Sequence, residues 1–215
     1  MDLFGIDWSD GWAGNITAEA LGLAGGILVT YLVAERVVRW RLTQERRPAR
    51  QRLMERLSSH IRGISATWLA ALGMSDSYDL GTSTADLEKA VQTELDSRFA
   101  PSPGITLDGL VARNLAAAGA FPNETLSRLY RGVLQELERV SRTADRFAVI
   151  LQEDGALHGL VADLEYCADS MALTLTTNPL LERLGLGDSA KLGVTTDCKL
   201  AFDRAAALRA HIEKP

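Results

Sequence analysis

Apolar residues recur along most of this chain at spacings of three and four residues, which is the period of an amphipathic α-helix. No stretch alternates between apolar and polar residues for long enough to predict a β-strand. The sequence therefore predicts an all-α protein. The pattern changes near the N-terminus, where an uncharged apolar segment replaces the single apolar stripe of an amphipathic helix.

The apolar segment near the N-terminus contains an uncharged run of 15 residues, Ala20–Ala34. Such a run spans about 22 Å as a helix, which is short of a hydrocarbon core of about 30 Å. The flanks extend it, because only one charge, Glu19, interrupts the run on its N-terminal side as far as Trp12. Trp12 and Trp40 are about 42 Å apart along a helix, and tryptophan is favoured at both membrane interfaces. We predict a transmembrane helix over residues 16–38; a core helix of a soluble protein is the alternative.

The charges on either side of this span predict its orientation. Residues 1–15 hold three aspartates and no lysine or arginine, whereas residues 36–56 hold eight arginines and two glutamates. Positively charged flanks stay on the cytoplasmic side, so we expect a short extracytoplasmic N-terminus over residues 1–15 and a cytoplasmic C-terminal part. A cleaved signal peptide is not expected, because no basic residue precedes the apolar run and no small-residue cleavage site follows it.

The arginines after the span form a basic juxtamembrane collar over residues 39–56, and residues 57–215 follow as a cytoplasmic domain. One interpretation is that the collar serves orientation alone. The other is contact with anionic headgroups of membrane lipids, worth about 1 kcal/mol for each charge near the surface. The arginines of this second interpretation are Arg36, Arg39, Arg41, Arg46, Arg47 and Arg50. Nucleic acid is not expected as a partner, because no basic surface is evident beyond the collar.

Small residues recur at every fourth position through the predicted span and form one narrow band along the helix. They are Ala18, Gly22, Gly26, Thr30 and Ala34, and Glu19 lies beside the band. Small residues let two membrane helices approach closely and associate. The band therefore predicts packing of the span against itself or against a partner membrane protein. Chance composition is the alternative, because glycine is common in such helices.

After the collar, apolar residues from Leu53 to Leu72 follow a helical spacing, and Gly73 is expected to end this helix. Pro48 is expected to break the basic helix or to start this one. The helix is amphipathic and its first half is rich in arginine. It either lies on the membrane surface or packs into the cytoplasmic domain, and packing is the interpretation that we favour.

The strongest periodicity lies in the middle of the domain. Apolar residues within 123–152 follow alternating steps of four and three, which is a heptad seam typical of a coiled coil. A second seam lies within residues 156–177 in a different phase. Because the two seams are out of phase, we expect the chain to turn near residues 153–155 and to form an antiparallel helical hairpin within a helical bundle. One continuous helix is the alternative.

Shorter helices complete the predicted domain. Ser83 or Thr84 is expected to cap one helix, and Thr106 the next. The glycine-rich residues 185–193 resemble a phosphate-binding loop only superficially, because no strand precedes them, so we interpret them as a connector. A final amphipathic helix is expected over residues 198–212.

The sequence contains little that indicates catalysis. It has no P-loop, no dinucleotide-binding glycine fingerprint after a strand, and no HExxH or CxxC motif. Asp154 and His158 are four residues apart and can share one helix face, which is half of a metal site. A di-metal carboxylate bundle also needs Glu-x-x-His motifs, which the sequence lacks. No catalytic residue, metal ligand or cofactor is therefore predicted, and His60 is expected to be solvated.

Two further groups of residues have ordinary interpretations. Asp163, Glu165 and Asp169 are expected to lie on a solvated helix, with a docking surface for a basic partner as the alternative. Cys167 and Cys198 lie on or beside apolar stripes, so they are expected to be buried, and reduced in a cytoplasmic domain.

The leading hypothesis is a non-enzymatic, single-pass protein of a bacterial inner membrane. Its cytoplasmic helical domain serves as a scaffold, adaptor or signalling subunit, and its span self-associates. The bacterial source is suggested by an excess of arginine over lysine and by abundant alanine and leucine. Two alternatives stay open: a membrane-tethered enzyme with a site of carboxylates and histidine in the domain, and a subunit of a channel-like membrane effector with Glu19 in an oligomeric assembly.

Overall fold

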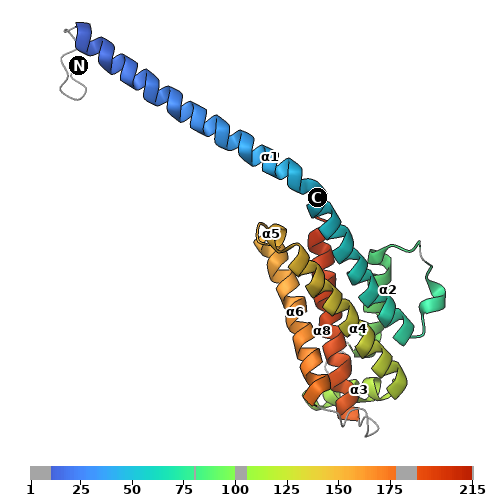
Figure 1. Ribbon diagram of the computed structural model, residues 1–215. Coiled ribbons are helices and arrows are strands. Elements are labelled where there is room, and N and C mark those ends of the chain that lie inside the picture. The colour runs from blue at the N-terminus through green and yellow to red at the C-terminus, as the bar shows by residue number, and fades with distance from the viewer. Residues whose placement is uncertain (1–10, 80, 100–105, 178–187, 215) are drawn as a thin grey trace. The chain divides into compact units, whose positions relative to one another are not determined.

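The computed structural model describes residues 11–79, 81–99, 106–177 and 188–214 of the 215-residue chain (Figure 1). Every regular element in these ranges is helical, so the prediction of an all-α fold is confirmed. The elements are α1 (Gly11–Ala71), the 3₁₀-helix η1 (Ser75–Ser77), α2 (Thr84–Phe99), α3 (Leu107–Gly119), α4 (Asn123–Arg146), α5 (Ala148–Leu151), α6 (Gly155–Thr177) and α8 (Asp188–Ile212).

The chain divides into two units, residues 1–48 and residues 49–215. The described part of the first unit is a single stretch of α1, and the second unit holds the remainder of α1 and the other helices. The second unit begins at Ala49, within the residues predicted as the basic collar, and Leu53 in this stretch is already fully buried. The end of the collar therefore belongs to the folded domain.

Pro48 lies inside α1, and the helix continues through it. The prediction that Pro48 breaks or starts a helix is therefore wrong. Proline holds φ near a helical value, so it can remain in a helix at the cost of a backbone N–H and its hydrogen bond to the carbonyl four residues earlier. The boundary between the two units falls directly after Pro48. The proline thus marks the division of the chain without ending the helix.

The part of α1 in the second unit supplies one wall of the hydrophobic core. Its apolar residues at the predicted helical spacing are 0% exposed, and they are Leu53, Leu57, Ile61, Ile64 and Trp68. The indole N–H of Trp68 donates to the carbonyl oxygen of Cys198 at 3.3 Å, which satisfies the one polar atom of this buried side chain. This face of α1 therefore packs into the domain, as predicted.

Helices α4, α6 and α8 pack against one another and supply much of the remaining core (Figure 1). α4 ends at Arg146 and α6 begins at Gly155, with the one-turn helix α5 between them, so the alternative of one continuous helix is wrong. The predicted seam residues within α4 are buried, and so are Leu129 and Leu134 beside them. The buried stripe is wider than a two-position seam because α4 contacts both α6 and α8.

Local signals set two of the helix ends. Gly73, at φ +73°, ends α1 in a Schellman motif, in which the N–H of Met74 donates to the carbonyl oxygen of Leu69 at 2.8 Å. The hydroxyl of Thr106 caps α3 by accepting a hydrogen bond from the N–H of Gly109 at 3.2 Å, as predicted. Both ends depend on residues close in the sequence, which is why they could be predicted.

Helix α8 begins at Asp188, earlier than predicted. Residues 188–193 are helical, so the interpretation of the glycine-rich stretch as a connector is wrong there; the rest of that stretch lies outside the described residues. The ammonium of Lys191 donates to the carbonyl oxygens of Gly119 and Phe121, each at 3.1 Å. These bonds attach the first turns of α8 to the end of α3, which is a contact between segments far apart in the sequence.

Two glycines bring α1 and α4 close together. A Cβ atom built on Gly63 of α1 would lie 2.7 Å from Cδ of Glu136, and one built on Gly132 of α4 would lie 2.7 Å from Cγ2 of Thr67. Both distances are shorter than an ordinary van der Waals contact. Each helix therefore has a glycine at the point where a side chain of the other helix approaches, because a Cβ atom there would come too close to it.

Candidate functional site

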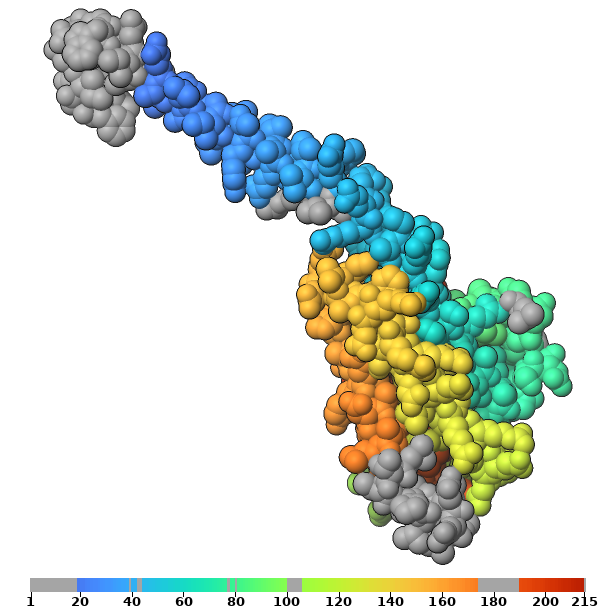
Figure 2. All heavy atoms as spheres, viewed as in Figure 1, coloured from blue at the N-terminus to red at the C-terminus, as the bar shows by residue number. Residues whose placement is uncertain are grey.

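The stretch Glu19–Val38 of α1, drawn in blue in Figure 2, is the most apolar exposed stretch in the described part of the first unit. It is 20 residues long, and none of it is buried. Large side chains are exposed along it, including Leu21 at 68%, Ile27 at 66% and Tyr31 at 65%. Among the described helices, this is the one long and apolar enough to cross a membrane, although a signal sequence has the same length and composition.

The predicted band of small residues lies along a shallow groove on this stretch. The residues that line the groove are Gly22, Leu23, Gly26, Ile27, Thr30, Tyr31 and Ala34. A Cβ atom built on Gly22 or Gly26 would meet nothing within 4 Å, so packing within the described chain does not account for these glycines. The hydroxyl of Thr30 donates to the carbonyl oxygen of Gly26 at 2.7 Å. Glu19 is exposed, and the side chain of Ala18 lies outside the described residues.

The collar arginines differ in their surroundings. Three of them, Arg36, Arg41 and Arg47, lie in the first unit and are exposed. Arg46 is half-buried and makes a contact of its own, and the side chain of Arg39 lies outside the described residues. Arg50 donates to Oδ2 of Asp154 at 2.9 Å. Arg50 therefore takes part in the fold of the second unit, whereas Arg36, Arg41 and Arg47 lie in the first unit and are exposed.

Asp154 connects three helices of the second unit. Its Oδ1 accepts from the N–H of Leu157 at 3.1 Å and so caps α6, its Oδ2 accepts from Arg50, and Nε2 of His211 lies 3.6 Å from Oδ1. The backbone N–H of Leu157 lowers the pKa of Asp154; partial burial opposes this, and the charges of His211 and Arg50 add to the lowering. The residue therefore joins the start of α6 to α1 and to the end of α8.

The structure gives the pair Asp154 and His158 different surroundings. Asp154 is engaged by the contacts just described, and His158 is exposed. Among the described residues, no group of three or more histidine, cysteine, aspartate or glutamate side chains lies close enough together to hold a metal ion. Asp154 and His158 therefore have no further candidate metal ligands beside them within the described part of the chain.

His60 lies where α1 meets α4, and the expectation that it is solvated is wrong. Its Nδ1 is 3.2 Å from Oε2 of Glu136, and its Nε2 is 3.2 Å from Oγ1 of Thr143. The side chains of His60 and Glu136 are only 18% and 14% exposed, and Thr143 is buried. Carboxylate, imidazole and hydroxyl follow the order of a hydrolytic triad, but a buried hydroxyl is inaccessible to a substrate. We interpret the group as a polar connection between two helices.

Glu88 and Arg209 form a second polar connection that the sequence did not predict. Nε of Arg209 donates to Oε2 of Glu88 at 2.5 Å and joins α8 to α2. Glu88 is 4% exposed, and its Oε1 has no hydrogen-bond partner among the described residues. Burial raises the pKa of Glu88, whereas the contact with Arg209 lowers it and the charge of Glu213 raises it. The pair is 121 residues apart in the sequence, so no local spacing indicates it.

Cys167 and Cys198 are buried and free, as predicted. Burial raises the pKa of both thiols above the ordinary value. A raised pKa disfavours the thiolate, which is the reactive form of cysteine. These two residues therefore serve packing in the described structure.

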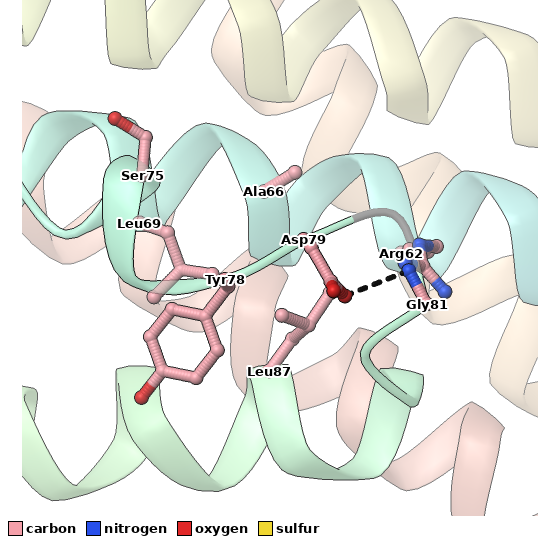
Figure 3. A pocket seen from close by; sticks show the side chains of 8 residues that line it. All are labelled: Arg62, Ala66, Leu69, Ser75, Tyr78, Asp79, Gly81 and Leu87. Carbon is pink, nitrogen blue, oxygen red and sulfur yellow. Dashed lines mark hydrogen bonds between the residues drawn. The ribbon is translucent and has the colours of Figure 1, made fainter.

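A hollow in the second unit lies between α1, the segment after it and α2 (Figure 3). Its volume is about 570 Å³, and its lining residues are Arg62, Ala66, Leu69, Ser75, Tyr78, Asp79, Gly81 and Leu87. Oδ1 of Asp79 accepts from the N–H of Gly81 at 2.9 Å and from the hydroxyl of Thr82 at 3.2 Å, which holds the loop in shape. Arg62 also has a contact of its own. The wall is mostly apolar and open to solvent, so its shape alone does not select a ligand.

Comparisons with protein-family models, with curated proteins and with solved structures found no match to this chain. A functional proposal therefore depends on the surfaces and contacts of the chain itself. The exposed apolar stretch of α1 is the feature that differs most from the surface of an ordinary soluble domain.

Proposed function

We propose that this protein is a single-pass membrane protein whose second unit is a helical interaction domain, serving as a scaffold, adaptor or signalling subunit and not as an enzyme. The observation that carries the proposal is the stretch Glu19–Val38, which has no buried residue. Removing apolar surface from water contributes about 25 cal/mol per Å². The hydrocarbon core of a bilayer surrounds a helix and can cover such a stretch on all of its sides.

The charges around the stretch support a retained span over a cleaved signal sequence. A signal sequence has basic residues before its apolar part and a small-residue cleavage site after it. Here aspartates precede the apolar residues and arginines follow them. This order supports a span with residues 1–15 outside and the second unit in the cytoplasm, which is the orientation proposed for the bacterial inner membrane.

The exposed collar arginines support contact with anionic lipid headgroups. Arg36, Arg41 and Arg47 are solvent-exposed beside the apolar stretch, and each contributes about 1 kcal/mol near an anionic surface. Arg50 is the exception, because its guanidinium is held by Asp154. The proposed lipid contact is therefore made mainly by the first part of the collar.

The groove along the span supports self-association. Gly22 and Gly26 lie in it and have no contact within the described chain that explains them. Close approach of two spans along this groove would gain van der Waals contact, which drives helix association in lipid. The proposed assembly is thus an oligomer of single spans, each attached to a helical bundle in which α4 and α6 form an antiparallel hairpin.

The polar contacts of the second unit favour an interaction role over catalysis. Asp154, His60 and Glu88 each join helices that are distant in the sequence. Such contacts rigidify a domain and specify one packing arrangement. A rigid domain attached to a membrane by one helix suits the presentation of a binding surface to other proteins.

Size analysis in mild detergent tests the proposed self-association. We expect the native protein to run as an oligomer and the variant Gly22→Leu with Gly26→Leu to run as a monomer, because leucine fills the groove. Gly25→Leu is the matched control, since it adds the same side chain away from the band and has equally open surroundings. If the native protein and the double variant both run as monomers, the proposed self-association is wrong.

A further inference from the structure

Helices α4 and α6 differ in the face that they present to solvent. The outward residues of α4 are charged or polar, and they are Arg128, Arg131, Gln135, Glu138 and Arg142. The outward residues of α6 within about 40° of Tyr166 on a helical wheel carry no charge. Those whose side chains the structure describes are Gly155, Gly159, Ala162, Tyr166, Ser170 and Leu173, and all of them are exposed. The solvent side of a helix in a globular domain is normally polar, so this face of α6 is unusual.

The sizes of the residues on this face suit contact with another helix. Tyr166 and Leu173 project from one end of it and are 73% and 63% exposed. At the other end, a Cβ atom built on Gly155 or Gly159 would meet nothing within 4 Å. Small residues that leave room and large apolar residues that project together form the surface that packs with the ridges and grooves of a neighbouring helix.

Gly159 is unexplained by the fold of the described residues. Glycine inside a helix is destabilising relative to alanine, so a helical glycine usually marks a close approach. Gly132 of α4 has such a reason, because Thr67 of α1 occupies the space beside it. Gly159 is likewise helical but faces open space. Gly159 therefore leaves room for an approaching helix on this face, although the open helical glycine Gly193 of α8 shows that such space is not by itself evidence of a partner.

Carboxylates border the apolar face on both sides. Glu165 and Asp169 lie on one side, where Asp145 of α4 is also close enough to act on Glu165, and Asp163 lies on the other side. Asp163 is paired with Arg204 at 3.0 Å. Burial raises the pKa of Glu165, and the charges of Asp145 and Asp169 raise it further while that of His158 lowers it. Cations brought to this border would relieve the repulsion among its carboxylates.

We propose that this face of α6 docks a basic amphipathic helix of a partner protein, whose apolar seam packs on Tyr166 and Leu173 between flanking lysines or arginines. Flanking charges of opposite sign set partner choice when two helices pack along an apolar seam. An antiparallel contact between the α6 faces of two copies is disfavoured, because it would bring Glu165 and Asp169 near the same carboxylates of the other copy. The inference rests on the interaction role proposed above and names its partner class, but it is independent of the span.

The test uses the whole protein in nanodiscs of zwitterionic lipid and two labelled synthetic helical peptides as probes. Both peptides have a seam of leucine and alanine; one carries lysine at the flanking positions and the other carries glutamate. Fluorescence anisotropy measures binding, with empty nanodiscs as the blank. We expect the lysine peptide to bind saturably and at least tenfold more tightly than the glutamate peptide. Tyr166→Ser with Leu173→Ser, which removes the apolar contact without adding charge, should weaken its binding at least tenfold.

Two further variants separate the shape of the face from its charge. Gly159→Leu should weaken binding of the lysine peptide at least tenfold. Gly193→Leu on α8 should leave binding unchanged, and it is the control because Gly193 is also exposed and has open space beside it. Glu165→Lys with Asp169→Lys should reverse the preference between the two peptides. Circular dichroism of each variant confirms that its helices are formed.

Equal binding of the two peptides would overturn the proposal, and so would lysine-peptide binding that survives Tyr166→Ser with Leu173→Ser. A change in the oligomeric size of the free protein caused by Tyr166→Ser with Leu173→Ser would identify a contact between copies and also contradict the proposal. Co-elution of the protein with the nanodiscs shows separately whether the span inserts into the lipid. Failure of the docking proposal is thereby distinguished from failure of the proposed membrane anchoring.

Discussion

The two parts of α1 carry apolar residues in different patterns and have different surroundings. Between Glu19 and Val38, exposed apolar side chains extend around the helix and none is buried. Between Leu53 and Trp68, apolar side chains follow one stripe, and those on the stripe are fully buried. A protein core offers a helix one surface, whereas lipid surrounds it. The difference teaches that the distribution of apolar residues around a helix, in addition to their number, distinguishes a candidate span from a core helix.

The largest expected effect concerns the exposed part of α1. Ile27→Arg with Val29→Arg places two charges near the middle of the proposed span. Each arginine makes the free energy of membrane insertion less favourable by about 2.5–3.5 kcal/mol. We expect the variant to leave the membrane fraction in an alkaline extraction, while the matched control Ile27→Leu with Val29→Leu stays in it. Unchanged membrane retention of the double arginine variant would contradict the proposed span.

The next effect concerns the buried part of α1. Trp68→Ala removes a fully buried side chain and its hydrogen bond to Cys198. We expect the free energy of unfolding of the second unit to fall by about 3–5 kcal/mol, as measured by denaturant titration with circular dichroism. Membrane retention should not change. Trp40→Ala is the control, because Trp40 is 62% exposed in the first unit; equal losses in the two variants would argue against this assignment of surroundings.

A smaller effect distinguishes the glycines near the two parts of α1. Gly132→Ala places a methyl group 2.7 Å from Cγ2 of Thr67 in the buried part, and overpacking of this kind costs about 1–3 kcal/mol. We expect the same denaturant titration to show this loss. Gly26→Ala in the exposed part meets nothing within 4 Å and should leave the stability of the second unit unchanged. A more stable Gly132→Ala variant would mean that α1 and α4 do not approach closely there.

The smallest effect is a pH dependence at Asp154, which pairs with Arg50 of the buried part. The folded protein lowers the pKa of Asp154 from the ordinary value of 3.8. Its contribution to stability is therefore present above that value and is lost as the pH falls through the lower, folded pKa. Asp154→Asn should flatten the acid side of the stability profile while keeping the cap of α6. Asp154→Ala should also lose the cap, at about 0.5–2 kcal/mol near neutral pH.

For each of the two Asp154 variants, a different result would contradict the expectation. An acid profile of Asp154→Asn that matches the native one would show that Asp154 has no lowered pKa in the folded state. An Asp154→Ala variant as stable as Asp154→Asn at neutral pH would show that the hydrogen bond from Leu157 contributes nothing to α6.

The features that could be predicted from the sequence depend on neighbouring residues. The buried stripe from Leu53 to Trp68 and the cap at Thr106 each follow from positions within one or two helical turns. The candidate span could also be predicted, because its length and composition are local. The prediction at Pro48 is wrong because the local tendency of proline to end a helix is outweighed by helix-forming sequence on both of its sides.

The features that could not be predicted depend on packing. His60 and Glu136 are 76 residues apart, and only the contact of α1 with α4 brings them together. The uncharged face around Tyr166 is hard to predict for a related reason. The apolar seam of α6 is evident in the sequence, but which of the other residues of α6 stay uncovered depends on the positions of α4 and α8. Acidic residues at 163, 165 and 169 gave the one sequence signal of a docking surface.

The central claim, that the exposed part of α1 is a retained membrane span, is tested most directly by one measurement. Membranes from cells that express the protein are extracted with alkaline carbonate, and the intact mass of the extracted protein is determined. The account predicts a protein in the membrane pellet whose mass includes residues 19–38. A protein released into the supernatant, or one that has lost those residues, would contradict it.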